Sequence, residues 1–84
     1  MEGSVQNCMA ELKRLASSAA EDPRPAAAQI VRKFKEGASK KDREGLKAAL
    51  EDARLIGLNT TVPAPFLTEH SRWLAAIEGA RAAV

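Results

Sequence analysis

Residues 39–59 carry the strongest secondary-structure signal in the chain. Apolar residues recur there at three- and four-residue steps, which places them on one face of a helix. They are Leu46, Ala49, Leu50, Ala53 and Ile56. Ser39 is a residue type that accepts a hydrogen bond from a first-turn amide, and Gly57 suits a left-handed helix stop. The segment therefore predicts a capped amphipathic helix over residues 40 to 56, and we expect the other helices to pack around it.

Three further segments show helical spacing of apolar residues. The predicted helices span residues 4 to 20, 25 to 36 and 66 to 78. Proline disfavours helical geometry in the residue before it, so the prolines predict breaks between helices. They are Pro23, Pro25, Pro63 and Pro65. Glu21 and Asp22 form a pair of adjacent carboxylates, and Asp22 is the predicted cap of the second helix.

The last helix and the loop before it complete the pattern. One side of that helix is formed by Leu67, His70, Leu74 and Ile77. Gly79 is expected to interrupt the helix, and residues 80–84 are expected to fray. In the loop over residues 58–65, Leu58 and Val62 are expected to point inward.

These elements predict an all-α fold. We expect a single helical domain over residues 1–84, built as a small four-helix bundle that is mainly antiparallel, with an extended proline-containing loop before the last helix. The composition agrees, because 45% hydrophobic and 29% charged residues are typical of folded chains rather than disordered ones. A domain of this length buries a thin core.

The residue types needed for catalysis or metal binding are scarce. One cysteine, Cys8, and one histidine, His70, cannot supply the three or four nitrogen or sulfur ligands of a typical zinc site. Glu69, His70 and Ser71 are consecutive, so a helix points them about 100° apart and they do not form a triad. We expect His70 to be packed and hydrogen-bonded to a neighbour, and Cys8 to be a small buried apolar residue. The sequence therefore predicts a protein that is not an enzyme and holds no cofactor or metal.

The sequence also predicts a cellular compartment. No apolar run reaches the roughly 18 residues of a membrane span, and residues 1–8 lack the basic and apolar regions of a signal peptide. A single cysteine fits a reducing environment. We expect a soluble cytoplasmic protein with no membrane partner.

Protein–protein interaction is the function that this composition favours. Several alanine-faced helices and a thin core can leave an apolar surface for a protein partner or for a second copy in a homodimer. The expected role is that of a small adaptor, regulator or inhibitor that docks a helical face. The candidate contact residues are Arg72, Trp73, Phe66 and Met9. Tryptophan and arginine are enriched at interface hot spots, although Trp73 also suits the bundle core.

A basic patch gives the alternative function. Its residues are Arg32, Lys33, Lys35, Lys40, Lys41, Arg43 and Lys47. Within that stretch the acidic residues are Glu36, Asp42 and Glu44, so the segment is locally positive although the net charge is only +2. The alternative is a small nucleic-acid-binding regulator that contacts phosphates through this patch. A helix-turn-helix is disfavoured, because the loop over residues 57–65 is longer than the turn of that motif.

Overall fold

The computed structural model describes residues 4–18 and 22–84. Their elements, in chain order, are α1 (Ser4–Ala16), α2 (Pro23–Gly37), α3 (Lys40–Asn59), the short 3-10 helix η1 (Ala64–Phe66) and α4 (Leu67–Ala83). This part of the chain contains four α-helices and no strand, which confirms the predicted all-α bundle. Residues 19–20, predicted to end the first helix, and Glu21 lie outside the described residues.

The two predicted helix caps are confirmed, although α2 begins at Pro23 and not at residue 25 as predicted. The Asp22 side chain accepts a hydrogen bond from the Arg24 backbone N–H at 3.0 Å, so Pro23 and Pro25 both lie in the first turn of α2. The Ser39 hydroxyl accepts a hydrogen bond from the Asp42 backbone N–H at 3.1 Å and caps α3. Both caps depend on residues only two or three positions apart, which is why the sequence is sufficient to predict them.

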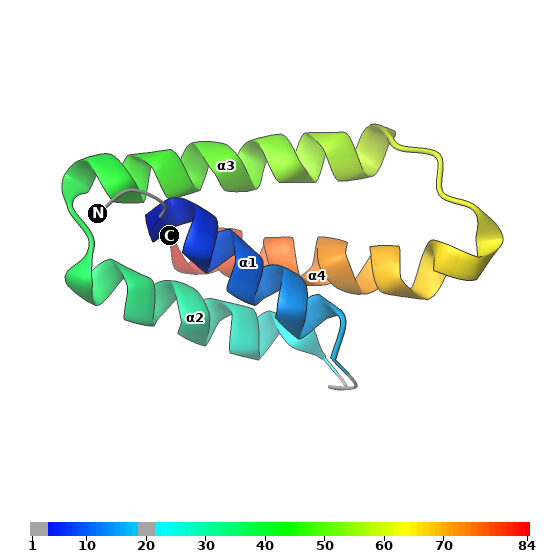
Figure 1. The fold of residues 1–84 in the computed structure, drawn as a ribbon, viewed down its shortest axis with the longest axis horizontal. Helices are drawn as coiled ribbons and strands as arrows, with labels where there is room; N and C mark the ends of the chain where they lie inside the picture. Colours follow the sequence, from blue (N-terminus) through cyan, green and yellow to red (C-terminus); the bar gives the residue numbers. More distant parts are fainter. Residues whose placement is uncertain (1–3, 19–21) are drawn as a thin grey trace.

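Successive helices run in opposite directions (Figure 1). In that view α3 and α2 form the two sides of the molecule, and α1 and α4 lie between them. Helix α4 contacts α1, α2 and α3, and its contact with α2 is the most extensive in the fold. The prediction that residues 39–59 are the central element is therefore wrong, because α4 occupies that position.

Small residues allow α4 to approach α2 closely. Ala27 of α2 and Ala76 and Ala80 of α4 are completely buried. A Cβ atom on Gly79 would lie 2.7 Å from the Cα of Arg24 and would also collide with the Arg24 carbonyl oxygen. The predicted helix interruption at Gly79 is wrong: α4 continues to Ala83, and Gly79 is a contact point for the α2 backbone.

Gly57 has a similar role on the other side of α4. It is buried inside α3, and a Cβ atom there would lie 2.6 Å from Cδ2 of Leu74. Helix α3 continues to Asn59, so the predicted stop at Gly57 is wrong. The last turn is held by side chains, with Asn59 Nδ2 donating to the Leu55 carbonyl and Thr60 Oγ1 donating to the Ile56 carbonyl.

The buried core lies mainly in one half of the molecule. Its largest fully buried side chains are Leu12, Val31, Leu46, Leu50 and Ile77. Three residues predicted to face inward, Ile56, Leu58 and Leu67, are instead 67%, 59% and 51% exposed. They belong to the last turn of α3 and the first turn of α4, and the end of the hairpin that these helices form projects beyond α1 and α2 (Figure 1). In the part of the chain that the structure describes, no helix is both long and apolar enough to span a bilayer.

Candidate functional site

The hairpin formed by α3, η1 and α4 projects beyond the other two helices (Figure 1). Helices α3 and α4 have 20 and 17 residues, whereas α1 and α2 have 13 and 15. We call the projecting end, residues 55–68, the distal arm. The longer helices therefore end in a region that the shorter ones do not cover.

The distal arm is apolar, exposed and uncharged. The exposed large apolar side chains on it are Leu55, Ile56, Leu58, Phe66 and Leu67. Among the described residues, only Val84 adds another exposed large apolar side chain. No Asp, Glu, Lys or Arg occurs in residues 55–68, although 29% of the whole chain is charged. Apolar surface and the absence of charge thus coincide in one place.

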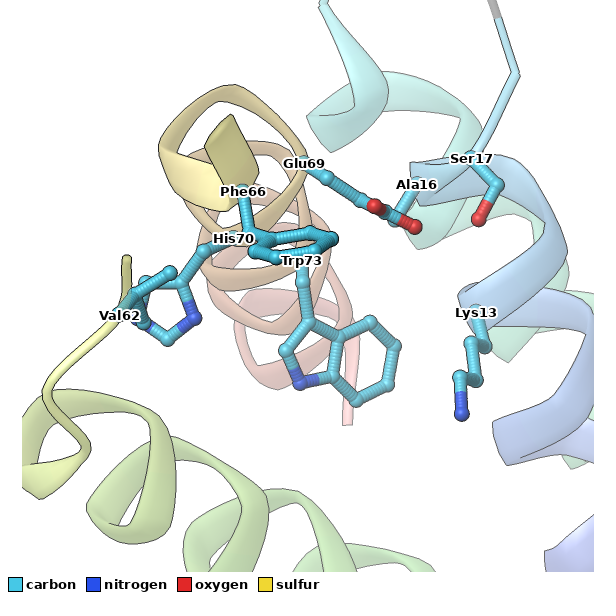
Figure 2. Close-up of a pocket in the computed structure, with 8 residues that line it drawn as sticks. All are labelled: Lys13, Ala16, Ser17, Val62, Phe66, Glu69, His70 and Trp73. Atoms are coloured by element: carbon cyan, nitrogen blue, oxygen red, sulfur yellow. The ribbon is translucent and has the colours of Figure 1, made fainter. Parts of the chain in front are cut away.

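A groove of about 370 Å³ lies between the distal arm and α1. It is lined by Lys13, Ala16, Ser17, Val62, Phe66, Glu69, His70 and Trp73. Figure 2 shows the Trp73 indole between the α1 side of the groove and the side formed by Val62 and His70, with the Phe66 ring nearby. Two aromatic rings therefore form much of an open, mainly apolar groove, and Lys13 and Glu69 add charge at its α1 side.

His70 joins the two helices of the hairpin. Its Nε2 atom lies 3.0 Å from the carbonyl oxygen of Gly57. A carbonyl oxygen only accepts, so Nε2 carries the proton and donates this hydrogen bond. The prediction of a packed histidine bonded to a neighbour is confirmed, and the bond positions the imidazole in the wall of the groove.

Cys8 is a core residue. It is only 4% exposed, as predicted for a small buried apolar side chain. Burial, with a smaller effect from the Glu11 carboxylate, raises the pKa of the Cys8 thiol to about 11. The thiol is therefore protonated at neutral pH, whereas nucleophilic cysteines require a lowered pKa.

The structure brings together two of the four predicted contact residues. Phe66 and Trp73 both line the groove. Arg72 is half-buried, and its Nε donates a hydrogen bond of 2.8 Å to the Ala16 carbonyl at the end of α1. Its Nη2 atom is buried without a hydrogen-bond partner among the described residues. Met9 is half-buried and packs against the core.

The seven basic residues differ in their surroundings. Lys35 is half-buried and donates a hydrogen bond of 3.1 Å to the Ala83 carbonyl at the end of α4. Lys33 lies at a groove shared with Glu11 of α1, whereas Lys47 lies at a groove shared with Arg81 of α4. The six others are exposed, and within the described ranges no ion pair joins any basic patch residue to Glu36, Asp42 or Glu44.

Sequence reasoning missed most of the distal arm. Helical periodicity predicts a buried face for Ile56 and Leu67, and it gives no signal that Leu55 belongs to a contact surface. The signal that identifies the arm is the run of fourteen residues without charge. Over residues 4–18 and 22–84, no group of three or more His, Cys, Asp or Glu side chains is placed to hold a metal ion.

Comparison of the chain with protein-family models, with curated proteins and with solved structures finds no match. The assignment of a function therefore depends on the geometry described above.

Proposed function

We propose that the protein is a non-enzymatic interaction module that docks a helical face of a protein partner on the distal arm and the adjoining groove. The observation that carries this proposal is the gathering of exposed apolar side chains on an uncharged arm, next to a groove walled by Phe66 and Trp73. Large apolar side chains exposed together in one part of a folded protein are typical of interaction sites.

Covering the arm supplies the driving force for docking. Removing apolar surface from water is worth roughly 25 cal/mol per Å² of area, and rings such as Phe66 and Trp73 present more area than other side chains. The large apolar side chains of the arm are about half exposed, so about half of that free energy is still to be gained when a partner covers them. Trp73 is held by packing against the core, which lowers the entropic cost of presenting it.

A helix is the occupant that suits this geometry. The groove lies between α1 and the segment from Val62 to Trp73, so Phe66 belongs both to the groove and to the exposed residues of the arm. An amphipathic helix would place one apolar side chain between Phe66 and Trp73 and its next turns along the arm, as in other helix-in-groove complexes. Lys13 and Glu69 on the groove would then set the orientation of the partner's charged residues.

Site-specific photo-crosslinking tests this function. We would replace Phe66 with p-benzoylphenylalanine, express the full chain in its native host and irradiate the cells. A matched control carries the same residue at Ala48, which is exposed on α3 but outside the distal arm. The proposal expects a discrete crosslinked protein from position 66 and none from position 48. No product from position 66, or identical products from both positions, would refute it.

Exposure of the basic residues favours a second candidate function, phosphate-directed binding of nucleic acid. Six of the seven are exposed and not paired with Glu36, Asp42 or Glu44 among the described residues. A gel-shift assay at low salt tests it. We expect affinity to fall steeply with salt and to weaken when Lys40, Lys41 and Arg43 are replaced by Glu. Unchanged migration of DNA and RNA at low salt would exclude this function.

A further inference from the structure

We infer that the occupant of the distal arm is a second copy of this chain, paired with the first about a two-fold axis. The inference rests on the proposed function and identifies its partner. In such a pairing the same surface patch is used by both copies, so it has to be complementary to itself.

The charge distribution carries this inference. In a two-fold pairing, residues close to the axis face their own copies, and any charge there would face an identical charge at a cost in free energy. The distal arm has no charged residue in fourteen, whereas charges occur at ordinary density on both sides of it, beginning with Arg54 and Glu69. An uncharged run of this length lets two identical surfaces face each other without repulsion between like charges.

The helical hairpin also suits self-pairing. Exposed apolar residues occur on both of its helices, with Leu55 and Ile56 on α3 and Leu67 at the start of α4. When two such hairpins pack around a two-fold axis, α3 of each copy can cover α4 of the other. This completes a four-helix arrangement at the end of the molecule where α1 and α2 are missing.

A lipid surface fits the arm less well. Peripheral membrane helices combine an apolar face with nearby Lys or Arg residues that attract anionic lipids. Here the basic patch surrounds the α2–α3 turn, at the opposite end of the molecule from the distal arm (Figure 1). The structure therefore places no basic cluster beside the arm, where it would reinforce contact with anionic lipids.

Sedimentation equilibrium of the full chain, from micromolar to millimolar concentration, tests the inference. The expected result is a mass that rises with concentration from 9.0 kDa to twice that value. Replacing both Leu55 and Ile56 with Lys places like charges at the interface and should weaken dimerisation by about tenfold or more. The control Ala48→Lys adds a charge to an exposed position of the same helix and should dimerise as the wild type does.

Each outcome decides the question. Circular dichroism verifies that the variants keep their helices, and Phe66→Ala, which introduces no charge, provides a second test of weakened dimerisation. A wild-type mass of 9.0 kDa at every concentration, or a dimer that the arm variants leave unchanged, overturns the inference. Wild-type pelleting with phosphatidylcholine–phosphatidylserine vesicles that Phe66→Ala weakens overturns it too, in favour of a membrane, because this variant adds no cation that would itself attract the anionic lipid.

The failure of this inference is distinguishable from failure of the proposed function. A monomeric wild type together with a crosslink from position 66 to a different protein refutes self-pairing and leaves the interaction module in place. A crosslinked product of two copies of the chain supports both. A monomeric wild type with no crosslink refutes both.

Discussion

At the scale of single residues, Arg72 shows that an expected contact residue has a clear role inside the fold. Its Nε donates to the carbonyl of Ala16, the last residue of α1, and the carbonyls of a last helical turn need partners from outside the helix. A positive charge at a helix C-terminus also interacts favourably with the helix dipole. These two effects join α4 to the end of α1.

Replacing Arg72 with Met therefore lowers stability. Met keeps the apolar part of the side chain but loses the charge-assisted hydrogen bond, so we expect the free energy of unfolding to fall by about 1–2 kcal/mol in urea titrations. The control is Arg54→Met, which removes a surface ion pair with Glu51 and should cost about 0.5 kcal/mol or less. If the free energy of unfolding falls equally in the two variants, the hydrogen bond from Arg72 to Ala16 does not stabilise the fold as described.

The Asp22 carboxylate makes the stability of the fold depend on pH in the acid range. Hydrogen bonds from the Arg24 side chain and backbone hold the pKa of the Asp22 carboxyl below its usual range. A lowered folded-state pKa means that the charged form stabilises the fold above the unfolded pKa, and that this contribution is lost as the pH falls through the folded pKa.

We therefore expect the Tm of the wild type to fall below about pH 4 more steeply than that of Asp22→Asn. Asn keeps an oxygen to accept the cap hydrogen bond but has no charge to lose. Thermal unfolding monitored by circular dichroism across the acid range measures the difference. Parallel Tm profiles for the two proteins would show that the carboxylate charge of Asp22 does not contribute.

At the scale of elements, the glycines distinguish close helix contacts from ordinary helix positions. Gly79 faces the backbone of Arg24, which cannot move aside cheaply, whereas a Cβ atom on Gly45 would make an ordinary contact of 3.5 Å with Val5. Both residues lie inside helices, where Gly is less favourable than Ala by about 0.5–1 kcal/mol.

The same substitution should thus have opposite effects at the two positions. Gly79→Ala is expected to destabilise the fold by about 1–3 kcal/mol, because α2 and α4 must move apart. Gly45→Ala is expected to stabilise it by about 0.5–1 kcal/mol. Chemical unfolding of both variants measures the two changes in the free energy of unfolding. Stabilisation by Gly79→Ala would show that α2 does not approach α4 closely at this position.

These glycines also mark where sequence reasoning stops being sufficient. The caps at Asp22 and Ser39 follow from neighbours in the chain, and the sequence predicts them correctly. A glycine such as Gly79 can end a helix or can be the point where a second helix packs closely. Which of the two occurs depends on the path of α2, and local sequence patterns carry no information about that path. Ile56 is a further example: its spacing predicts a place on the buried face of the helix, but its side chain is 67% exposed, because burial depends on which helices cover that end of α3.

At the scale of the whole molecule, unequal helix lengths produce the candidate site. The core is closed where all four helices overlap, and the longer hairpin continues past it with its apolar side chains exposed. The sequence predicts Phe66 and Trp73 as contact residues from residue type alone. It does not predict the arm as a surface, because the exposure of the arm depends on the tertiary arrangement.

Hydrogen exchange measured by mass spectrometry tests the docking role of the distal arm most directly. The account predicts that amide exchange over residues 55–68 slows when the wild type is concentrated from the micromolar to the millimolar range. Amides over residues 36–45, at the opposite end of the molecule, provide the internal reference and should exchange at the same rate throughout. Slower exchange that is confined to residues 36–45 would contradict the account. Unchanged exchange in every part of the chain would also contradict it if crosslinking from position 66 yields no product.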